Sequence, residues 1–219
     1  RPGELSLAHH GVLFLDELPE FRRDALEALR EPLEEGVVRV TRTSGSRSFP
    51  ARFLLVAAMN PCPCGYRGDP RRPCSCSEHD VARYRRKVSG PLLDRIDLHV
   101  EVPALPASDL AGAAVPEASA AVRERVVRAR ARQAERNGDP RLTNAALPQS
   151  RLRSTAALHP DAAPLLSRAM DRLALSARAH QRVVRVARTI ADLDGSPGVS
   201  PGHVAEALRY RPALAPPAP

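Results

Sequence analysis

The segment GVLFLDELPEF (Gly11–Phe21) constrains the fold of this chain more than any other stretch. Its apolar run, Val12–Leu15, is typical of a buried strand and leads directly into two adjacent carboxylates, Asp16 and Glu17. Unpaired charge at the edge of a core is unfavourable, so a carboxylate pair there needs a specific reason. The usual reason is a metal–phosphate site, in which one acid holds Mg²⁺ and the next polarises a water molecule. The alternative is a buried strand that merely ends at two solvated acids.

A second apolar run, FLLVAAMN (Phe53–Asn60), predicts a strand buried on both faces of a parallel sheet. Asn60 ends this strand, and its amide can hydrogen-bond an attacking water and a phosphate without adding charge. The alternative is an asparagine that makes the turn before Pro61. Between the two strands, the sequence predicts a helix over Arg22–Glu35, bent by a proline, and an arginine-rich hairpin over Val37–Phe53.

The composition changes after residue 103. An Ala- and Pro-rich linker and a long basic helix are expected next, and only helix signals follow them. Ser176 and Ser200 are expected to cap the last two helices. We also expect a short basic helix over Glu78–Val88 and a strand at the end of Pro91–Val102. The predicted organisation is an α/β domain over 1–103, a linker and basic helix over 104–148, a helical domain over 149–212 and a disordered tail over 213–219.

Composition limits the classes of partner. The chain has 219 residues, of which 43% are apolar, only 3% aromatic and none tryptophan, so its core must be aliphatic. The net charge of +8 is carried almost wholly by arginine, and it favours polyanionic partners such as nucleotides and DNA. No apolar run is long enough to cross a bilayer and we find no signal peptide, so we expect a cytoplasmic protein without a membrane partner. The chain starts at Arg1 without an initiator methionine, and we expect it to be a fragment.

The cysteines form one cluster in the sequence. Two C-x-C pairs are separated by the nine residues Gly65–Pro73. Four thiolates match the ligand count of a structural Zn²⁺ site, whereas reduced free thiols, disulfides and an iron–sulfur cluster are the alternatives. His79 lies nearby and is either a substitute ligand or a surface residue. The predicted zinc ligands are Cys62, Cys64, Cys74 and Cys76.

Four segments together carry a family resemblance: GVLFLDELPEF, AAMNPCPCG, SGPLLDRIDLHVEV and LSARAHQRVVRVARTIADL. In this order and spacing, from Gly3 to about Pro212, they closely resemble the Mg-chelatase-like AAA+ proteins of the ComM and YifB type. The resemblance implies part of a P-loop ATPase core, with a parallel sheet and a pre-sensor 1 hairpin, followed by an all-α lid. It also implies a helicase-like, ATP-driven hexamer for DNA branch migration in natural transformation. A weaker resemblance reaches the Mg-chelatase ATPase subunit and the MCM helicases.

The resemblance assigns roles to the residues at the two strand ends. Asp16 resembles the Walker B aspartate that holds Mg²⁺, and Glu17 resembles the glutamate that polarises the attacking water. Asn60 resembles the sensor 1 asparagine. These roles imply ATP and Mg²⁺ as cofactors.

The resemblance also names arginines that contact nucleotide. Arg95 resembles an arginine finger that reaches the γ-phosphate of a neighbouring subunit. The alternative is an internal ion pair with Asp94 or Asp97. Arg178 resembles sensor 2 of the lid, and Arg182, one turn further on, remains open as the working residue.

The hairpin resembles one that lines the central channel of related helicases. Its arginines Arg39, Arg42 and Arg47 could grip DNA phosphates without sequence specificity, or could simply protect an edge hairpin from aggregation. The arginine-rich helix near 123–136 could also contact DNA, but a solvated helix face that connects the core to the lid is the simpler interpretation.

The chain contains no G-x-x-x-x-G-K-[ST] phosphate loop, and its sole lysine, Lys87, lies outside any such motif. We therefore expect the phosphate cradle upstream of Arg1, and the fragment alone to bind ATP weakly and to hydrolyse it negligibly. Three functions remain in view. The first is an AAA+ motor on single-stranded or branched DNA, the second a metal-chelatase-like remodelling ATPase, and the third a non-catalytic DNA-binding or assembly module.

Overall fold

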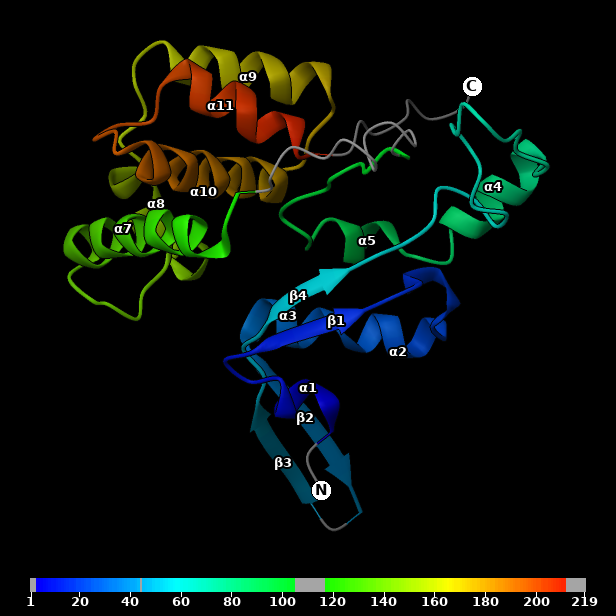
Figure 1. The fold of residues 1–219 in the computed structure, drawn as a ribbon. Coiled ribbons are helices and arrows are strands. Elements are labelled where there is room, and N and C mark those ends of the chain that lie inside the picture. Colours follow the sequence, from blue (N-terminus) through cyan, green and yellow to red (C-terminus); the bar gives the residue numbers. More distant parts are fainter. Residues whose placement is uncertain (1–2, 44, 105–116, 212–219) are drawn as a thin grey trace. The chain divides into compact units, whose positions relative to one another are not determined.

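The computed structural model describes residues 3–43, 45–104 and 117–211 (Figure 1). The chain divides into two compact units, with the boundary between Ile96 and Asp97. The first unit is mixed α/β and the second is helical, as the sequence predicts.

The first unit is built on a small parallel sheet. Strands β1 (Val12–Leu15) and β4 (Leu54–Ala57) pair in parallel, with Val12 opposite Leu54 and Leu15 opposite Ala57. Alternate residues point to opposite faces of a strand, so Leu13 and Leu15 share one face. That face packs on an aliphatic core. The buried members of this core are Leu18, Leu26, Leu29, Val88 and Leu92.

The other face of the sheet is open in this chain. Val12 and Phe14 are each 59% exposed and Leu54 is 63% exposed. We expected the 53–60 strand to be buried on both faces, and in the described residues it is not. Burial of both faces requires a layer on each side, and the helices of this unit cover only one.

The helices of this unit are short. They are α1 (Glu4–Leu7), the 3₁₀ turn η1 (Leu18–Glu20), α2 (Arg23–Ala28), α3 (Arg30–Glu35), α4 (Glu78–Arg85) and α5 (Gly90–Leu93). One bent helix was expected over 22–35, whereas the structure has two helices that meet at Leu29. Pro32 explains the break, because its ring clashes with the carbonyl four residues earlier, at Ala28, where α2 ends.

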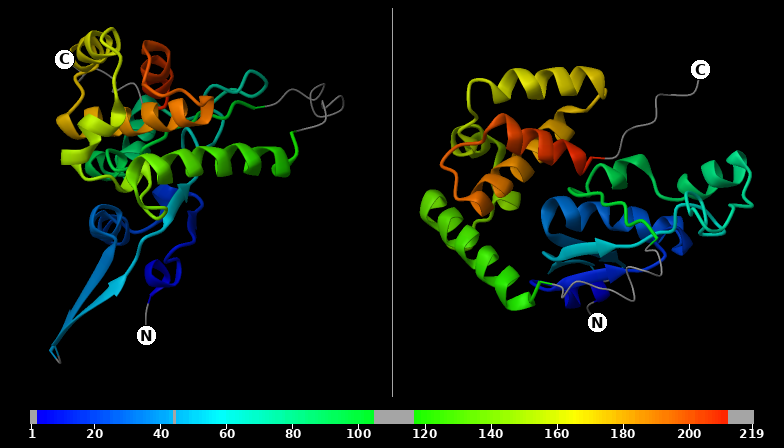
Figure 2. Two further views of the ribbon diagram at one scale, coloured as in Figure 1. Left: turned by 90° about the vertical axis from the view of Figure 1, so that its left-hand side faces the viewer. Right: turned by 45° about the horizontal axis from the view of Figure 1, so that its top comes forward.

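An antiparallel hairpin joins α3 to β4. Strands β2 (Val37–Arg42) and β3 (Gly45–Pro50) pair with Val37 opposite Pro50 and Val40 opposite Arg47. The hairpin extends away from the small parallel sheet of its unit (Figure 2). The predicted hairpin is thus present.

The second unit is a bundle of helices packed around the long helix α10. Its elements are α7 (Ser119–Asn137), η2 (Asn144–Ala146), α8 (Gln149–Ala156), α9 (Ala162–Arg172), α10 (Ala177–Asp194) and α11 (Pro201–Arg209). Ser176 and Ser200 cap α10 and α11 by accepting backbone N–H groups, as predicted. The aliphatic core includes Leu147, Leu152, Leu166, Val183, Ala187, Ala191, Val199 and Val204.

A buried polar cluster joins α7, η2 and α10. The fully buried carboxylate of Asp192 accepts hydrogen bonds from both Nη atoms of Arg136, at 2.5 and 2.8 Å. Asn144 Nδ2 donates to it at 2.8 Å, and Arg188 Nη2 lies 2.9 Å away. The basic helix α7 is therefore held against α10 by the ion pair between Arg136 and Asp192.

The segment after α5 differs from expectation. A strand was predicted at the end of Pro91–Val102, but no strand follows α5 before residue 104. Val100 and Val102 are strongly exposed. A strand requires a neighbouring strand to share its hydrogen bonds, and none of the described strands pairs with this segment. His99 N–H donates instead to the carbonyl of Tyr210 at 2.8 Å. The linker expected after residue 103 falls mostly on 105–116, and the tail on 213–219, both outside the described residues.

In the described ranges, no helix is both long enough and apolar enough to cross a membrane.

Candidate nucleotide and metal sites

The two strands end at the same edge of the sheet. Because β1 and β4 are parallel and Leu15 lies opposite Ala57, the residues that follow them emerge side by side. Leu18 N–H donates to the carbonyl of Ala58 at 2.9 Å, which fixes the first turn beyond the strands. Asp16 and Glu17 follow β1 directly, and Asn60 comes three residues after Ala57. All three side chains are exposed.

Glu17 has an unusual backbone. Its φ of 51° and ψ of 47° place it in the left-handed region, which costs a residue with a side chain of the order of 1 kcal/mol. Asp16 Oδ1 accepts the Glu17 N–H at 2.9 Å, and the next residue, Leu18, is buried. The local structure therefore holds the carboxylate pair in a sharp turn at the strand end. Strained turns of this kind cluster at functional sites.

Tyr84 of α4 supports the same edge, and the sequence reasoning missed it. This side chain is buried, and the backbone of Asn60 lies close enough to its hydroxyl to affect its pKa. Burial raises the pKa of Tyr84 more than the Asn60 backbone lowers it, and the carboxylates of Glu20 and Glu17 raise it further. The only available signal was an aromatic residue inside a basic helix of an otherwise aliphatic chain.

Arg95 forms an internal ion pair with Glu34, an acid that the sequence did not suggest. Its side chain is 6% exposed, and its Nη2 donates to Glu34 Oε1 at 2.5 Å. Nη1 donates to the carbonyl of Pro91, also at 2.5 Å. Glu34 is 61 residues away in the sequence, which is why the local reading named only Asp94 and Asp97.

The two sensor 2 candidates have different environments. Arg178 lies exposed in the first turn of α10. Arg182 is half-buried, and its Nη1 contacts Asp97 Oδ1 at 2.5 Å within the same unit. Arg178 is thus the more accessible cation for a phosphate.

The hairpin arginines also separate. Arg39 pairs with Ser48 and Arg47 with Val40, so these arginines occupy opposite faces of the hairpin. Arg39 contacts Glu31, and its Nη2 lies 2.6 Å from Glu35 Oε2. Hydrogen bonds from Arg39 to these carboxylates, first to Glu35, raise its pKa. Arg47 is exposed, whereas the side chain of Arg42 lies outside the described part of the chain.

The four cysteines converge in space. Their Sγ atoms all lie within 4.8 Å of one another. Cys62 and Cys64 are 3.4 Å apart, and Cys74 lies 3.6 Å from each. A tetrahedral zinc site with Zn–S bonds of about 2.3 Å places its sulfurs about 3.8 Å apart. All four cysteines are free thiols, so the donor set and the spacing fit a structural Zn²⁺ ion. The group contains no histidine, which leaves His79 outside it.

The electrostatics of the cluster also favour a cation. Backbone N–H groups of Tyr66 and Ser75 hold the pKa of Cys64 at about 5. A backbone hydrogen bond from Cys64 favours the thiolate of Cys76, but burial and the neighbouring sulfurs raise its pKa to about 12. The four sulfurs can therefore ionise together only if a positive charge joins them.

Residues around the cysteines make the loop rigid. Arg72 stacks on the ring of Tyr66 at 4.0 Å, and its Nη1 donates to the Tyr66 hydroxyl at 2.6 Å. Directly after Cys76, Ser77 and Asp80 form a reciprocal capping box at the start of α4. The cluster is thereby connected to the helix that carries Tyr84.

Comparison with protein families identifies the two halves of the chain. The family described as magnesium chelatase, subunit ChlI, matches residues 1–110, and the family described as the ChlI C-terminal region matches residues 116–211. The two matches fall on the α/β half and the helical half of the chain.

Curated relatives match along almost the whole chain. The uncharacterized protein YifB of Escherichia coli is 48% identical over 212 residues, and the competence protein ComM of Haemophilus influenzae is 47% identical over 213. The uncharacterized protein Rv2897c of Mycobacterium tuberculosis is 46% identical over 219. Each match covers 96% of this chain but only 41% or 42% of the relative, so the chain spans about two fifths of their length.

Proposed function

The chain belongs to the magnesium chelatase ChlI family of AAA+ ATPases, and from this membership we propose that it is part of an ATP-driven motor acting on DNA. The observation that carries the proposal is the carboxylate pair held in a strained turn at the end of β1, beside β4, which Asn60 follows by three residues. The likeness to a protein named for competence supports DNA as the substrate.

In this proposal, each exposed side chain at the sheet edge has one task. Asp16 would hold Mg²⁺ through the water shell of the ion, which prefers oxygen ligands and keeps several of its waters. Glu17 orients and polarises the attacking water, and Asn60 hydrogen-bonds that water and the γ-phosphate. The ion spreads the developing negative charge, so the protein groups need only position the reactants.

The site requires a phosphate cradle that this chain does not contain. No G-x-x-x-x-G-K-[ST] motif occurs in its 219 residues. The relatives are more than twice as long as the matched region, and we place the cradle in the part without a counterpart here. ATP turnover is accordingly a property of the longer protein.

We expect the protein to assemble into a ring, a hexamer, in which Arg95 of one subunit lies at the nucleotide of the next and takes part in catalysis. Its guanidinium would leave Glu34 and contact the γ-phosphate bound to a neighbouring subunit, where such a group accelerates the reaction about 10³–10⁵-fold. Arg178 would contact phosphate from the lid, because it is the accessible one of the two candidates. The zinc held by the four cysteines would fix the loop that leads to α4, with no part in the chemistry.

The hairpin is the proposed DNA contact. Arg47 is the better phosphate ligand, because Arg39 already has two carboxylate partners. A motor that moves along DNA of any sequence needs phosphate contacts of this sequence-independent kind. Such a motor would work in the cytoplasm.

The test is ATP hydrolysis by the full-length protein that contains this chain, with and without forked or four-way DNA. Strong stimulation by DNA is the expected result. Turnover that ignores DNA would favour a chelatase-like remodeller, as the family name suggests. An absence of turnover, with an intact phosphate loop, would favour a non-catalytic binding module.

A further inference from the structure

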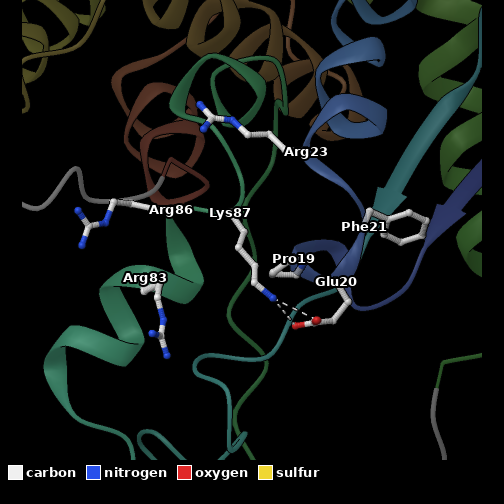
Figure 3. Close-up of a pocket in the computed structure, with 7 residues that line it drawn as sticks. All are labelled: Pro19, Glu20, Phe21, Arg23, Arg83, Arg86 and Lys87. Atoms are coloured by element: carbon white, nitrogen blue, oxygen red, sulfur yellow. Dashed lines mark hydrogen bonds and ion pairs between the residues drawn. The ribbon is translucent and has the colours of Figure 1, made fainter.

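A basic hollow lies beside the carboxylate turn, and none of the roles above uses it. It has a volume of about 420 Å³ and lies between the η1–α2 segment and the end of α4 (Figure 3). Its lining residues are Pro19, Glu20, Phe21, Arg23, Arg83, Arg86 and Lys87. Four cations therefore surround one carboxylate.

The cations are only partly neutralised. Lys87 Nζ lies 3.0 and 3.1 Å from the two oxygens of Glu20, and Arg83 Nη2 lies 2.9 Å from Asp80 Oδ1. Arg86 donates through Nε to the carbonyl of Ala82, and within the described ranges no acid lies at ion-pair distance from it. Arg23 contacts no acid among the described residues closely enough for an ion pair. Both guanidiniums are exposed and available to an anion.

The arrangement matches a chain of phosphates. Arg83, Arg86 and Lys87 are spaced i, i+3 and i+4 along the α4 segment, and Arg23 lies across the hollow at the start of α2 (Figure 3). Guanidinium forks bind phosphate oxygens in pairs. Phe21, 41% exposed, adds an apolar ring of the kind on which a base can stack.

We propose that this hollow binds the sugar–phosphate backbone of a single nucleic-acid strand. The proposal rests on the proposed function, since it adds a second DNA contact to that of the hairpin. The hollow is an open surface lined mainly by cations, which suits a polyanionic strand better than a compact metabolite. Arg23 follows the η1 turn that begins immediately after Glu17, so a bound strand would press on the segment that holds the carboxylate pair.

The test measures binding of a fluorescent single-stranded oligonucleotide by anisotropy, without ATP, over a range of salt concentrations. The variant is Arg23→Gln with Arg86→Gln. The matched control is Arg22→Gln with Arg85→Gln, which removes the same charge from neighbouring exposed positions outside the hollow. Thermal unfolding of both variants checks that the fold is kept.

Each phosphate contact to a single strand contributes about 0.7 to the slope of log K against log salt, or about fivefold in affinity at about 0.1 M salt. The hollow variant should therefore bind about 25-fold more weakly, with a salt slope smaller by about 1.4. The control should retain most of the affinity. Equal losses in both variants, or none in the hollow variant, would overturn the proposal.

Two further arms separate this proposal from the proposed function. If Arg47→Gln weakens binding while the hollow variant does not, DNA binding stands and the hollow is excluded. If the unsubstituted protein binds no DNA, both proposals fail. Tripolyphosphate tests the rival ligand, because a hollow variant that loses only tripolyphosphate affinity would assign the hollow to a nucleotide.

Discussion

Replacement of Asp192 by alanine should destabilise the helical unit by about 3 kcal/mol, near the lower end of the range for breaking a buried ion pair. The substitution removes the shared acceptor of Arg136, Arg188 and Asn144. These groups would remain at the junction of α7, η2 and α10 without that acceptor, and their other partners would satisfy only some of their donors.

The structure explains why the lower end applies. Arg188 keeps two other acceptors, the carbonyls of Ser196 at 2.7 Å and Pro197 at 2.9 Å. The side chain of Arg136 is 24% exposed, so water can solvate it in part. Asn144 is 1% exposed; its Nδ2 keeps the hydroxyl of Thr189 as an acceptor at 3.0 Å, and its Oδ1 still accepts from Arg136 Nη2 at 2.9 Å. A loss of about 3 kcal/mol is a large share of the stability of a typical domain.

The assay is urea unfolding of the chain followed by far-ultraviolet circular dichroism. Asp194→Asn is the matched control, because Asp194 lies on the same helix but its side chain is 60% exposed and bonded only to His203. That change should cost less than about 1 kcal/mol. If the two substitutions cost the same, the buried cluster does not stabilise this unit.

Acid titration tests the same cluster independently. Burial would raise the pKa of Asp192, but hydrogen bonds from Arg136 and Asn144 and the charge of Arg188 outweigh it and hold the pKa below its usual value. The carboxylate therefore stabilises the fold fully above pH about 4, and this contribution is lost as the pH falls further. Below pH 4, the unsubstituted chain and the Asp192→Ala variant should converge in stability. A constant difference down to low pH would contradict the assignment.

Three other predictions concern the proposed sites. Substitution of Cys76 by serine should release the zinc bound to the purified chain and lower its unfolding temperature; a protein without metal at the outset would refute the zinc site. Arg95→Ala should abolish ATP turnover in the full-length protein, and mixing it with a Glu17→Gln protein should restore some, because the active site is shared; no rescue would exclude a finger that acts in trans. Arg47→Gln should weaken DNA binding, measured by anisotropy, more than Arg39→Gln does, because Arg39 already has carboxylate partners. The reverse order would place the DNA contact on the other face of the hairpin.

Much of the fold could be predicted from local patterns in the sequence. Local patterns correctly predicted the strand that leads into Asp16, the hairpin and the serine caps of the last two helices. Each of these features depends mainly on residues that are neighbours in the sequence. The open face at Phe14 and the missing strand near Val100 depend on which surfaces the rest of the protein would cover. A local pattern cannot supply that information.

The site was predicted unevenly for the same physical reason. Adjacent residues, such as the carboxylate pair, stand out in the sequence. The partner of Arg95 and the support of Asn60 by Tyr84 result from tertiary contacts between segments that are distant in the sequence. Likewise, four cysteines in two close pairs predict a metal site, but only their convergence to within 4.8 Å gives it a geometry.

The most direct test of the central claim is ATP binding and turnover by the full-length Glu17→Gln protein. Removal of the general base should leave ATP affinity nearly unchanged and lower turnover at least about a hundredfold. Glu20→Gln, three residues further on and paired with Lys87, is the matched control and should keep its turnover. Normal turnover in the Glu17→Gln protein would show that the strained carboxylate turn at the end of β1 is not the hydrolytic site.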